Sequence, residues 1–440
     1  MHGDRESRYR TWLVPALYAA TAIALSFVLP RVEHSFFPHL VSPVSVSVAA
    51  TGYAAIASGM IALTGIVFSL TFVMVQFSAT AYSPRLALWL VQDPFLAHAL
   101  GMFIATFVYA IAALAWLGRD NMTGAPLISA CLVIALLLAS MGMFISLIKR
   151  IGTLQVNRIL TVTGDQGREA ITALYPALES HYQQPAAGTV VQSRPSQTLI
   201  HWGEPRVVQA IKTGKLLQLA TTHDCLIELE VSVGDVVVEL TPVLHIFGSK
   251  QKIDEQVLRH AIDFGEQRTF TQDPKYAIRL LVDIAIRALS PAINDPTTAT
   301  QALDQIGDLM VRLGLRRIEI GTFSDNHGVL RVVVPYPSWD DFLELAFGEI
   351  CYYGANSMQV MRRMNALVSD LKAALPETRR PTLLEWQRRI QNTVARSFEV
   401  AEEKQMASRE DRQGLGATRR NNNLELNRLE RARPRQSRES

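Results

Sequence analysis

A run of polar residues late in the chain carries most of the side-chain chemistry in this sequence. Its centre is "ALSPAINDPTTAT", residues 288–300, where two prolines bracket an Asn-Asp pair and two threonines follow. Backbone amides at the start of a helix, with arginines nearby, are typical of a site for an anion or a nucleotide. We take as candidate ligand-binding residues Arg268, Gln272, Asp273, Asp283, Arg287, Ser290, Asn294, Asp295, Thr297 and Thr298.

The same residues also fit a purely structural interpretation. Pro291 predicts the end of a helix before it, because a residue that precedes proline avoids the α region. Asn294 or Asp295 then caps the next helix, whose first position is a proline, as helices favour. In this interpretation Asn294 takes a left-handed turn and Asp283 pairs with Arg287, four residues on. Both interpretations stay open, and the structural one is favoured.

Neither an enzyme nor a metal site is indicated. We find no His–Ser–Asp order, phosphate loop or carboxylate pair beside a defined nucleophile, so we name no catalytic residue and no cofactor. Cys131, Cys225 and Cys351 form no CxxC pair. The group "THDC" cannot easily converge on one ion, because neighbours on a strand point to opposite faces. An enzyme acting on a membrane substrate is the least favoured functional class.

Four apolar segments dominate the first third of the chain. Trp12–Leu29, Ala54–Phe77, Phe95–Leu117 and Leu127–Ile148 lack Asp, Glu, Lys and Arg, and each is 18 to 24 residues long. About 20 apolar residues span a bilayer as an α-helix. We therefore predict an α-helical membrane domain of four transmembrane helices over residues 12–150, after an N-terminal stretch 1–11.

Flanking charges predict the orientation of these helices. Basic residues gather before the first helix, between the second and third, and after the fourth: Arg5, Arg8, Arg10, Arg85, Lys149, Arg150 and Arg158. The other two loops carry only Arg31 and Arg119. By the positive-inside rule, a multi-pass protein of the cell inner membrane then has both termini in the cytoplasm.

The second apolar segment carries a polar stripe made of Thr51, Ser58, Gly65, Ser69 and Gln76, which Ser83 extends beyond the membrane. At 100° per residue the first five lie within about 20° of one line. Such a stripe either lines a water-filled path or forms a helix-packing seam. Thr64, Thr71 and Ser78 form a second stripe on the opposite face. A helix with two polar faces packs on both sides, so we expect a homo-oligomer.

Secondary transport is disfavoured by the membrane segments. Proton- and cation-coupled transporters usually place an acidic residue inside a span, and none of the four predicted segments contains one. The one histidine there, His98, lies near the cytoplasmic end of the third helix.

After residue 150 the chain is more polar, and we expect a cytoplasmic α+β domain. A connecting helix (151–188) should lead into a small β module (189–250), with strands at "TVVQ", "LLQLA", "CLIELEV", "DVVVEL" and "VLHIF" and a hairpin or tight turn at Gly234-Asp235. The stretch "VGDVV" is similar to small barrel-sandwich domains, although no Met-Lys-Met attachment site is present. We therefore expect a barrel-like module for docking or sensing. Residues 251–375 should form an α+β helical domain that contains the Asn-Asp-Pro corner.

The last segment, 376–440, is expected to form a charged helix (383–406) and a disordered basic tail. Residues 404–440 contain ten basic and five acidic residues, a composition typical of segments that stay unfolded. Surplus arginine favours contact with anionic lipid headgroups. The tail has no aromatic residue for stacking on bases, which argues against nucleic acid as a partner. A solvated tail that binds neither is the simplest alternative.

Several of these stretches resemble those of one protein family. They are "GIVFSLTFVMVQFSATAYSPRL" and "GMFIATFVYA" in the membrane segments, then "VGDVV" and "QDPKYAIRLLVDIAIRALSPAINDPTTA". Over roughly residues 10–375 the chain resembles the predicted bacterial membrane proteins grouped as domain of unknown function 2254. The resemblance implies a shared topology and no particular activity.

Two functional classes remain. One is an oligomeric channel-like or transport-related protein with a cytoplasmic regulatory domain. The polar stripe is the feature of the sequence that suggests this class. The other is a non-transporting sensor or scaffold at the membrane that binds a small anionic ligand or a protein partner. In both classes the expected partners are the lipid bilayer and further copies of the chain.

Overall fold

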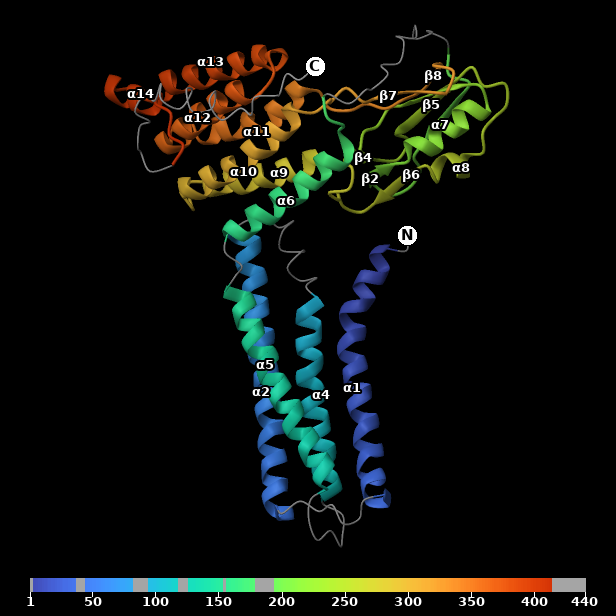
Figure 1. The fold of residues 1–440 in the computed structure, drawn as a ribbon, viewed down its shortest axis with the longest axis vertical. Coiled ribbons are helices and arrows are strands. Elements are labelled where there is room, and N and C mark those ends of the chain that lie inside the picture. Colours follow the sequence, from blue (N-terminus) through green and yellow to red (C-terminus); the bar gives the residue numbers. More distant parts are fainter. Residues whose placement is uncertain are drawn as a thin grey trace, which may run out of the picture. The chain divides into compact units, whose positions relative to one another are not determined.

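The computed structural model of this chain describes residues 3–36, 44–81, 94–117, 126–152, 156–178 and 194–413. Ser83, the expected strand "TVVQ" and the tail from residue 414 lie outside the described residues. The chain divides after Arg158 into two compact units, and each is described by itself (Figure 1).

Four long helices form the first unit: α1 (Gly3–Phe36), α2 (Val46–Ala81), α4 (Pro94–Leu117) and α5 (Leu127–Gly152). Each contains a stretch long and apolar enough to cross a membrane, namely Leu13–Glu33, Val46–Val73, Phe95–Leu117 and Leu127–Lys149. A long helix satisfies its own backbone hydrogen bonds, as a bilayer requires. The prediction of four membrane helices is confirmed.

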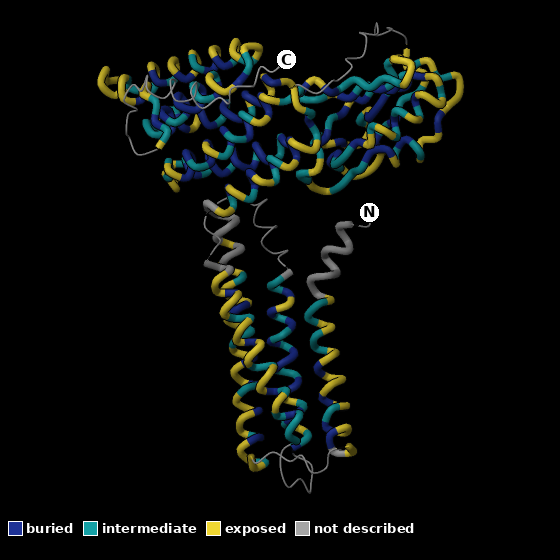
Figure 2. The backbone as a smooth tube through the Cα atoms, viewed as in Figure 1, coloured by how far each residue is buried: buried dark blue, intermediate teal, exposed yellow. Residues whose placement is uncertain are grey.

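The other three helices of this unit pack against α4. In its most apolar stretch 44% of the residues are buried, against 17% in each of the other three helices. Many buried residues of α4 are small, among them Ala99, Ala105, Ala110 and Ala113. Small residues let neighbouring helices approach closely, which is how membrane helices gain packing energy. Much of the surface of α1, α2 and α5 stays exposed (Figure 2).

The first helix is longer than the sequence predicted. We expected it to end at Leu29, but α1 continues to Phe36. The guanidinium of Arg31 lies 5.4 Å from the ring centroid of Trp116 in α4, which holds this extra turn against the bundle. The extension carries Glu33 into a buried position. The candidate membrane span therefore reaches Glu33, an acidic residue beyond the end of the segment predicted from the sequence.

The second unit begins within α6 (Val156–Leu174), and a β-rich part follows that helix. Its elements are β1 (Gln197–Ile200), β2 (Arg206–Ile211), α7 (Thr213–Thr222), β3 (Leu226–Leu229), β4 (Val236–Val237), β5 (Pro242–Phe247), α8 (Glu255–Arg259) and β6 (Ile262–Gly265). The expected strand "LLQLA" is instead part of α7. Leu216 and Ala220 are both buried and lie four residues apart, which is the spacing of a helix face and not of a strand.

The strands form two open sheets, so the expected barrel-like module is not confirmed. One sheet has the order β1-β5-β3-β8-β7 and the other β4-β2-β6. β8 (Leu330–Val333) pairs in parallel with β3, and β7 (Thr322–Ser324) pairs with β8, so the module recruits strands from far beyond residue 250. With two residues, β4 is too short to close the sheets. Gly234 and Asp235 form a tight turn between strands of different sheets.

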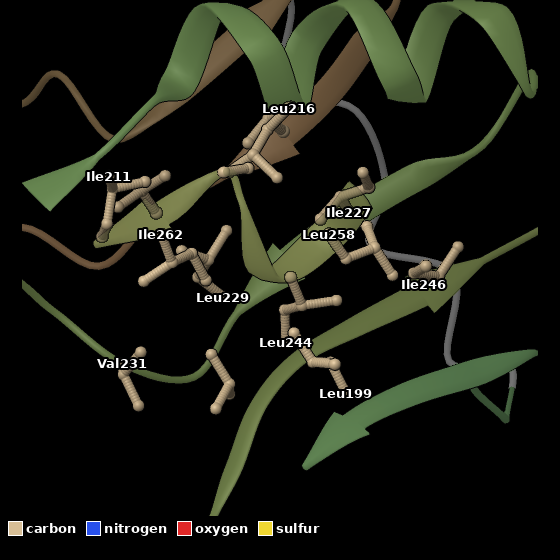
Figure 3. Close-up of a cluster of buried hydrophobic side chains, with 14 of the residues drawn as sticks. Leu199, Ile211, Leu216, Ile227, Leu229, Val231, Leu244, Ile246, Leu258 and Ile262 are labelled. Carbon is tan, nitrogen blue, oxygen red and sulfur yellow. The ribbon is translucent and has the colours of Figure 1, made fainter. Parts of the chain in front are cut away.

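The core of the β-rich part gathers side chains from both sheets and from α7 and α8 (Figure 3). Ile227 and Leu229 of β3 alternate with half-buried neighbours, as expected for a strand with one face in a core. They join Leu244 of β5, Leu216 of α7 and Leu258 of α8 in one cluster. Each such side chain stabilises the fold by about 1.5–3 kcal/mol when fully buried.

The helical part of the second unit comprises α9 (Pro274–Ala288), α10 (Pro296–Gly314), α11 (Trp339–Tyr353), α12 (Met358–Ala374), α13 (Arg380–Ser397) and α14 (Ala401–Ala407), with a 3-10 turn at Glu377–Arg379. α9 packs against α10 and α11, and α12 packs against α10, α13 and α14. Ser338 and Asp341 form a capping box that fixes the start of α11. Together with the β-rich part, these helices make the second unit a mixed α/β region.

The C-terminal segment is more ordered than its composition suggested. The expected helix 383–406 divides into α13 and α14, because Phe398 is in an extended conformation. Beyond α14, Arg412 pairs with Asp370 of α12 at 2.5 Å, and Asp411 is buried. These contacts fasten the chain to α12 as far as Gln413, so the expectation of disorder from residue 404 is wrong for this stretch.

Candidate functional site

The Asn-Asp-Pro corner joins α9 to α10 through a tight turn. The carboxylate of Asp295 caps α10 by accepting hydrogen bonds from Thr298 N at 3.1 Å and from Thr298 Oγ1 at 2.5 Å. Asn294 has a φ of +49°, and its N–H donates to Ser290 O at 2.9 Å. Of the two predicted caps Asp295 is the one used, and Asn294 supplies the left-handed turn.

Two more candidate residues flank this corner. Arg287 lies in the last turn of α9, where the helix dipole favours a positive charge. Thr297 is exposed in the first turn of α10, beside the buried Thr298. The hydrogen bonds that Ser290, Asn294, Asp295 and Thr298 form with one another stay within the corner, as the structural interpretation expects.

A second polar group lies at the start of α9. Asp273 is only 2% exposed and accepts a hydrogen bond from Tyr276 N at 3.1 Å. Arg268 binds both carboxylate oxygens, with Nε at 2.8 Å and Nη2 at 3.0 Å. Burial raises the pKa of Asp273, and the positive charge of Arg268 opposes that rise. Arg268 and Asp273 therefore form a bidentate ion pair that is largely buried.

Gly234 brings the β-rich part against this ion pair. Its φ is +93°, and a Cβ atom there would overlap the Arg268 guanidinium and lie 2.7 Å from Asp273 Oδ2. Gln272, with a φ of +56°, accepts a hydrogen bond from Ile211 N of β2 at 3.0 Å. The stretches "VGDVV" and "QDP" therefore meet at one junction inside the second unit.

Asp283 links α9 to α11 through an arginine that we did not predict. Arg279 Nε donates to Asp283 at 2.7 Å, and its two other nitrogens bind Glu349 at 2.5 and 2.9 Å. The hydrogen bonds from Arg279 lower the pKa of Glu349. The spacing of four residues between Arg279 and Asp283 was the signal in the sequence that could have identified this pair.

The candidate ligand-binding residues do not converge on one site. Arg268, Gln272 and Asp273 lie together at the start of α9, whereas the corner lies beyond its end. α9 has 15 residues, and at about 1.5 Å per residue its ends are roughly 20 Å apart. Asp283 lies on the helix between them and faces α11. The candidate residues are close in the sequence, which suggested one pocket. In the structure α9 separates them into two groups.

A small cavity of about 10 Å³ lies beside Asp273. Tyr175, Ser232 and Tyr336 are among its lining residues. Tyr175 is buried, and its hydroxyl has no hydrogen-bond partner within the described residues. This volume accommodates about one water molecule, so the cavity is too small for a nucleotide.

A larger open groove, of about 700 Å³, runs along α11. It is lined by Arg279, Asp341, Glu344, Leu345, Gly348, Glu349, Tyr352 and Tyr353. Tyr352 and Tyr353 are exposed, and their rings meet edge to face with centroids 5.2 Å apart. The lining holds three carboxylates and one arginine. Glu349 pairs with Arg279, and Glu344 pairs with Arg389.

The polar stripe of α2 faces away from the bundle. Its described members are all exposed: Thr51, Ser58, Gly65, Ser69 and Gln76. The buried residues of α2 include Tyr53, Ala57, Met60 and Val67. At 100° per residue the two sets lie on nearly opposite faces of the helix. The stripe therefore does not line a path within one four-helix protomer.

Two buried polar groups inside the bundle were missed by sequence reasoning. Between α4 and α5, Thr106 Oγ1 and Ser140 Oγ form a hydrogen bond of 2.8 Å. Glu33 of α1 accepts hydrogen bonds from Ile128 N at 2.8 Å and Ser129 N at 3.2 Å, at the start of α5. No local pattern marks either group, because their partners come from distant helices.

The architecture defines the class of protein: four candidate membrane helices followed by a mixed α/β region. A family model described as "Predicted membrane protein (DUF2254)" matches residues 8–370. The chain therefore belongs to this family, and the resemblance found in its motifs is confirmed.

The curated relatives are uncharacterised proteins. One from Mycobacterium tuberculosis is 28% identical over 330 residues, which are 71% of this chain and 62% of the relative. A protein of Mycobacterium bovis matches with the same values. The chain thus covers less than two thirds of the length of these relatives. No solved structure matches the chain.

Proposed function

We propose that this protein is an oligomeric, channel-like membrane protein whose second unit regulates it. The observation that carries the proposal is the outward face of α2. Six exposed residues follow one another there at alternating intervals of four and three: Thr51, Ala55, Ser58, Ala62, Gly65 and Ser69. All six have small side chains, and three carry a hydroxyl.

Alternating three- and four-residue spacing is the pattern with which two helices pack side by side at a shallow angle. Small residues allow close approach in a membrane, and the amide of Gln76 adds a group that bonds between helices. The same face gains little packing energy when it lies against lipid tails. Several copies of α2 around one axis would bring their hydroxyls together into a polar path, which a single four-helix protomer does not offer.

We also place the protein in the bacterial inner membrane with both termini in the cytoplasm. The support is the concentration of arginine and lysine before the first helix and after the fourth. In this orientation the second unit is cytoplasmic. The arginine-rich sequence after residue 414 then has the charge to bind anionic headgroups of the inner leaflet.

The groove along α11 favours a second candidate function. A non-transporting sensor or scaffold would use α2 only as a packing seam and would recruit a partner through the second unit. The exposed Tyr352 and Tyr353, beside Glu344 and Glu349, suit a cationic protein segment better than a small anion.

Ion flux from proteoliposomes containing the full-length protein tests the proposal. Gln76→Leu removes the amide from the stripe, and Phe68→Leu is the control on another exposed face of α2. Flux that changes in Gln76→Leu and not in Phe68→Leu supports a channel. Oligomers that weaken in Gln76→Leu, without flux of any ion, support the scaffold. A monomer without flux contradicts both.

A further inference from the structure

Among the buried polar side chains of the first unit, one group takes a single member from each of the four described membrane helices. Its members are Glu33 of α1, Tyr53 of α2, Tyr109 of α4 and Ser129 of α5, with exposures of 3%, 6%, 1% and 3%. Tyr53 and Tyr109 belong to one buried cluster of the bundle, and both phenols lie within electrostatic range of the Glu33 carboxylate. The bundle therefore holds one carboxylate and three hydroxyls together, shielded from solvent.

Glu33 has no cationic partner within the described residues. Among the residues that the structure describes, its two oxygens accept hydrogen bonds from the main-chain N–H groups of Ile128 and Ser129. The start of a long helix such as α5 supplies about half a positive charge, which does not balance a full carboxylate. Arg31 is engaged elsewhere, because its Nη1 donates to Phe27 O at 2.7 Å and its guanidinium stacks on Trp116.

The three hydroxyls of this group have no hydrogen-bond partner in the described part of the chain. Those of Tyr109 and Ser129 lie close together, yet neither forms a hydrogen bond by distance and angle within the described residues. An unpaired buried hydroxyl costs about 1–3 kcal/mol, and folded proteins rarely keep one. Three of them beside an unbalanced carboxylate point to a ligand that binds oxygen atoms.

We propose that Glu33, Tyr53, Tyr109 and Ser129 bind a small monovalent cation, and Na⁺ is the probe to use. Carboxylate and hydroxyl oxygens are hard ligands of the kind that hard cations select. One positive charge balances one carboxylate, whereas sites for divalent ions usually supply more acidic oxygens. A water molecule would satisfy hydroxyls and leave the charge of Glu33 unbalanced.

Cation binding at this place would tie the four helices together. A ligand that binds only the folded bundle stabilises it by mass action. Thermal unfolding of the full-length protein in detergent therefore reports on the site, with NaCl replaced stepwise by choline chloride at constant ionic strength. We expect the Tm to rise with Na⁺ concentration and to reach a plateau.

Two variants locate the effect and one controls for it. Glu33→Gln removes the charge, and Tyr109→Phe removes a single hydroxyl with little change of shape, so both should abolish the Na⁺-dependent rise in Tm. Tyr18→Phe should retain it, because the Tyr18 hydroxyl lies elsewhere in the bundle, 3.3 Å from His98 Nδ1. If Glu33→Gln does not fold, Tyr109→Phe alone shows whether the Na⁺-dependent rise in Tm comes from this site.

Three outcomes overturn the proposal. The first is a wild-type Tm that does not depend on Na⁺, which leaves at most buried water. The second is a Tm that depends on pH alone and loses this dependence in Glu33→Gln, which means that a proton balances the carboxylate. The third is a Na⁺ effect that persists in Tyr109→Phe. None of these readouts involves flux or oligomers, so they are independent of the proposed channel.

Discussion

One methyl group at Gly234 should disrupt the junction between the β-rich and helical parts of the second unit. Gly234→Ala introduces a Cβ atom where the Arg268 guanidinium lies, 2.7 Å from Asp273 Oδ2. It also forces alanine to adopt a φ of +93°. The substitution therefore combines backbone strain with displacement of a buried ion pair.

The two costs can be estimated separately. A left-handed conformation costs an L-residue about 1–2 kcal/mol. Breaking a buried ion pair costs about 3–5 kcal/mol, because it leaves a buried charge uncompensated. The Arg268 side chain is 27% exposed and can move partly aside, which limits the second cost. We therefore expect a total loss of about 3–5 kcal/mol in local stability.

Hydrogen exchange of the full-length protein in detergent measures this loss. A change of about 3 kcal/mol accelerates exchange roughly a hundredfold in peptides from β2, β4 and the start of α9. Gly203→Ala is the matched control, because Gly203 has a φ of +105° and no atom within 4 Å of its Cβ position. Equal acceleration in both variants would refute the reasoning, since only backbone strain would then be at work.

Three further substitutions have expected outcomes. Asp295→Ala should destabilise α10 by about 1 kcal/mol and Asp295→Asn much less, because asparagine retains a capping oxygen; equal shifts in Tm would contradict the cap. Ser140→Ala should cost about 0.6 kcal/mol in unfolding from detergent, as is typical of hydrogen bonds between membrane helices; a stabilised variant would contradict the bond to Thr106. Arg279 lowers the pKa of Glu349 below its ordinary 4.5, so this pair stabilises the protein above that pH and the effect is lost as pH falls through the lower, folded value. The Tm difference between wild type and Glu349→Gln should therefore be present at neutral pH and shrink on acidification; a difference that grows on acidification has the wrong sign.

Features set by local chemistry could be predicted from the sequence. The four membrane helices follow from uninterrupted apolar length, and that signal needs no knowledge of the fold. The corner was predictable because Asp295 and the proline after it encode the start of α10 by themselves.

Features that depend on distant partners could not be predicted. Gly234, Arg268 and Asp273 are separated in the sequence, and only the folded second unit brings them together. Glu33 bonds to N–H groups about a hundred residues away, while its charged neighbour Arg31 made the segment resemble the end of a span. Short apolar runs such as "LLQLA" fit a strand or a buried helix equally well. The contacts that such a run makes in the fold decide which structure it adopts.

The most direct test of the proposed channel is the accessibility of the outward face of α2 to a water-soluble thiol reagent in membranes. Ser58→Cys and Ser69→Cys lie on the stripe, and Phe68→Cys lies on another exposed face. All three are made in a chain where the exposed Cys131 is replaced by serine. We predict labelling of both stripe variants and none of the Phe68 variant. No labelling of either stripe variant, or equal labelling of all three, would contradict a polar path formed by α2.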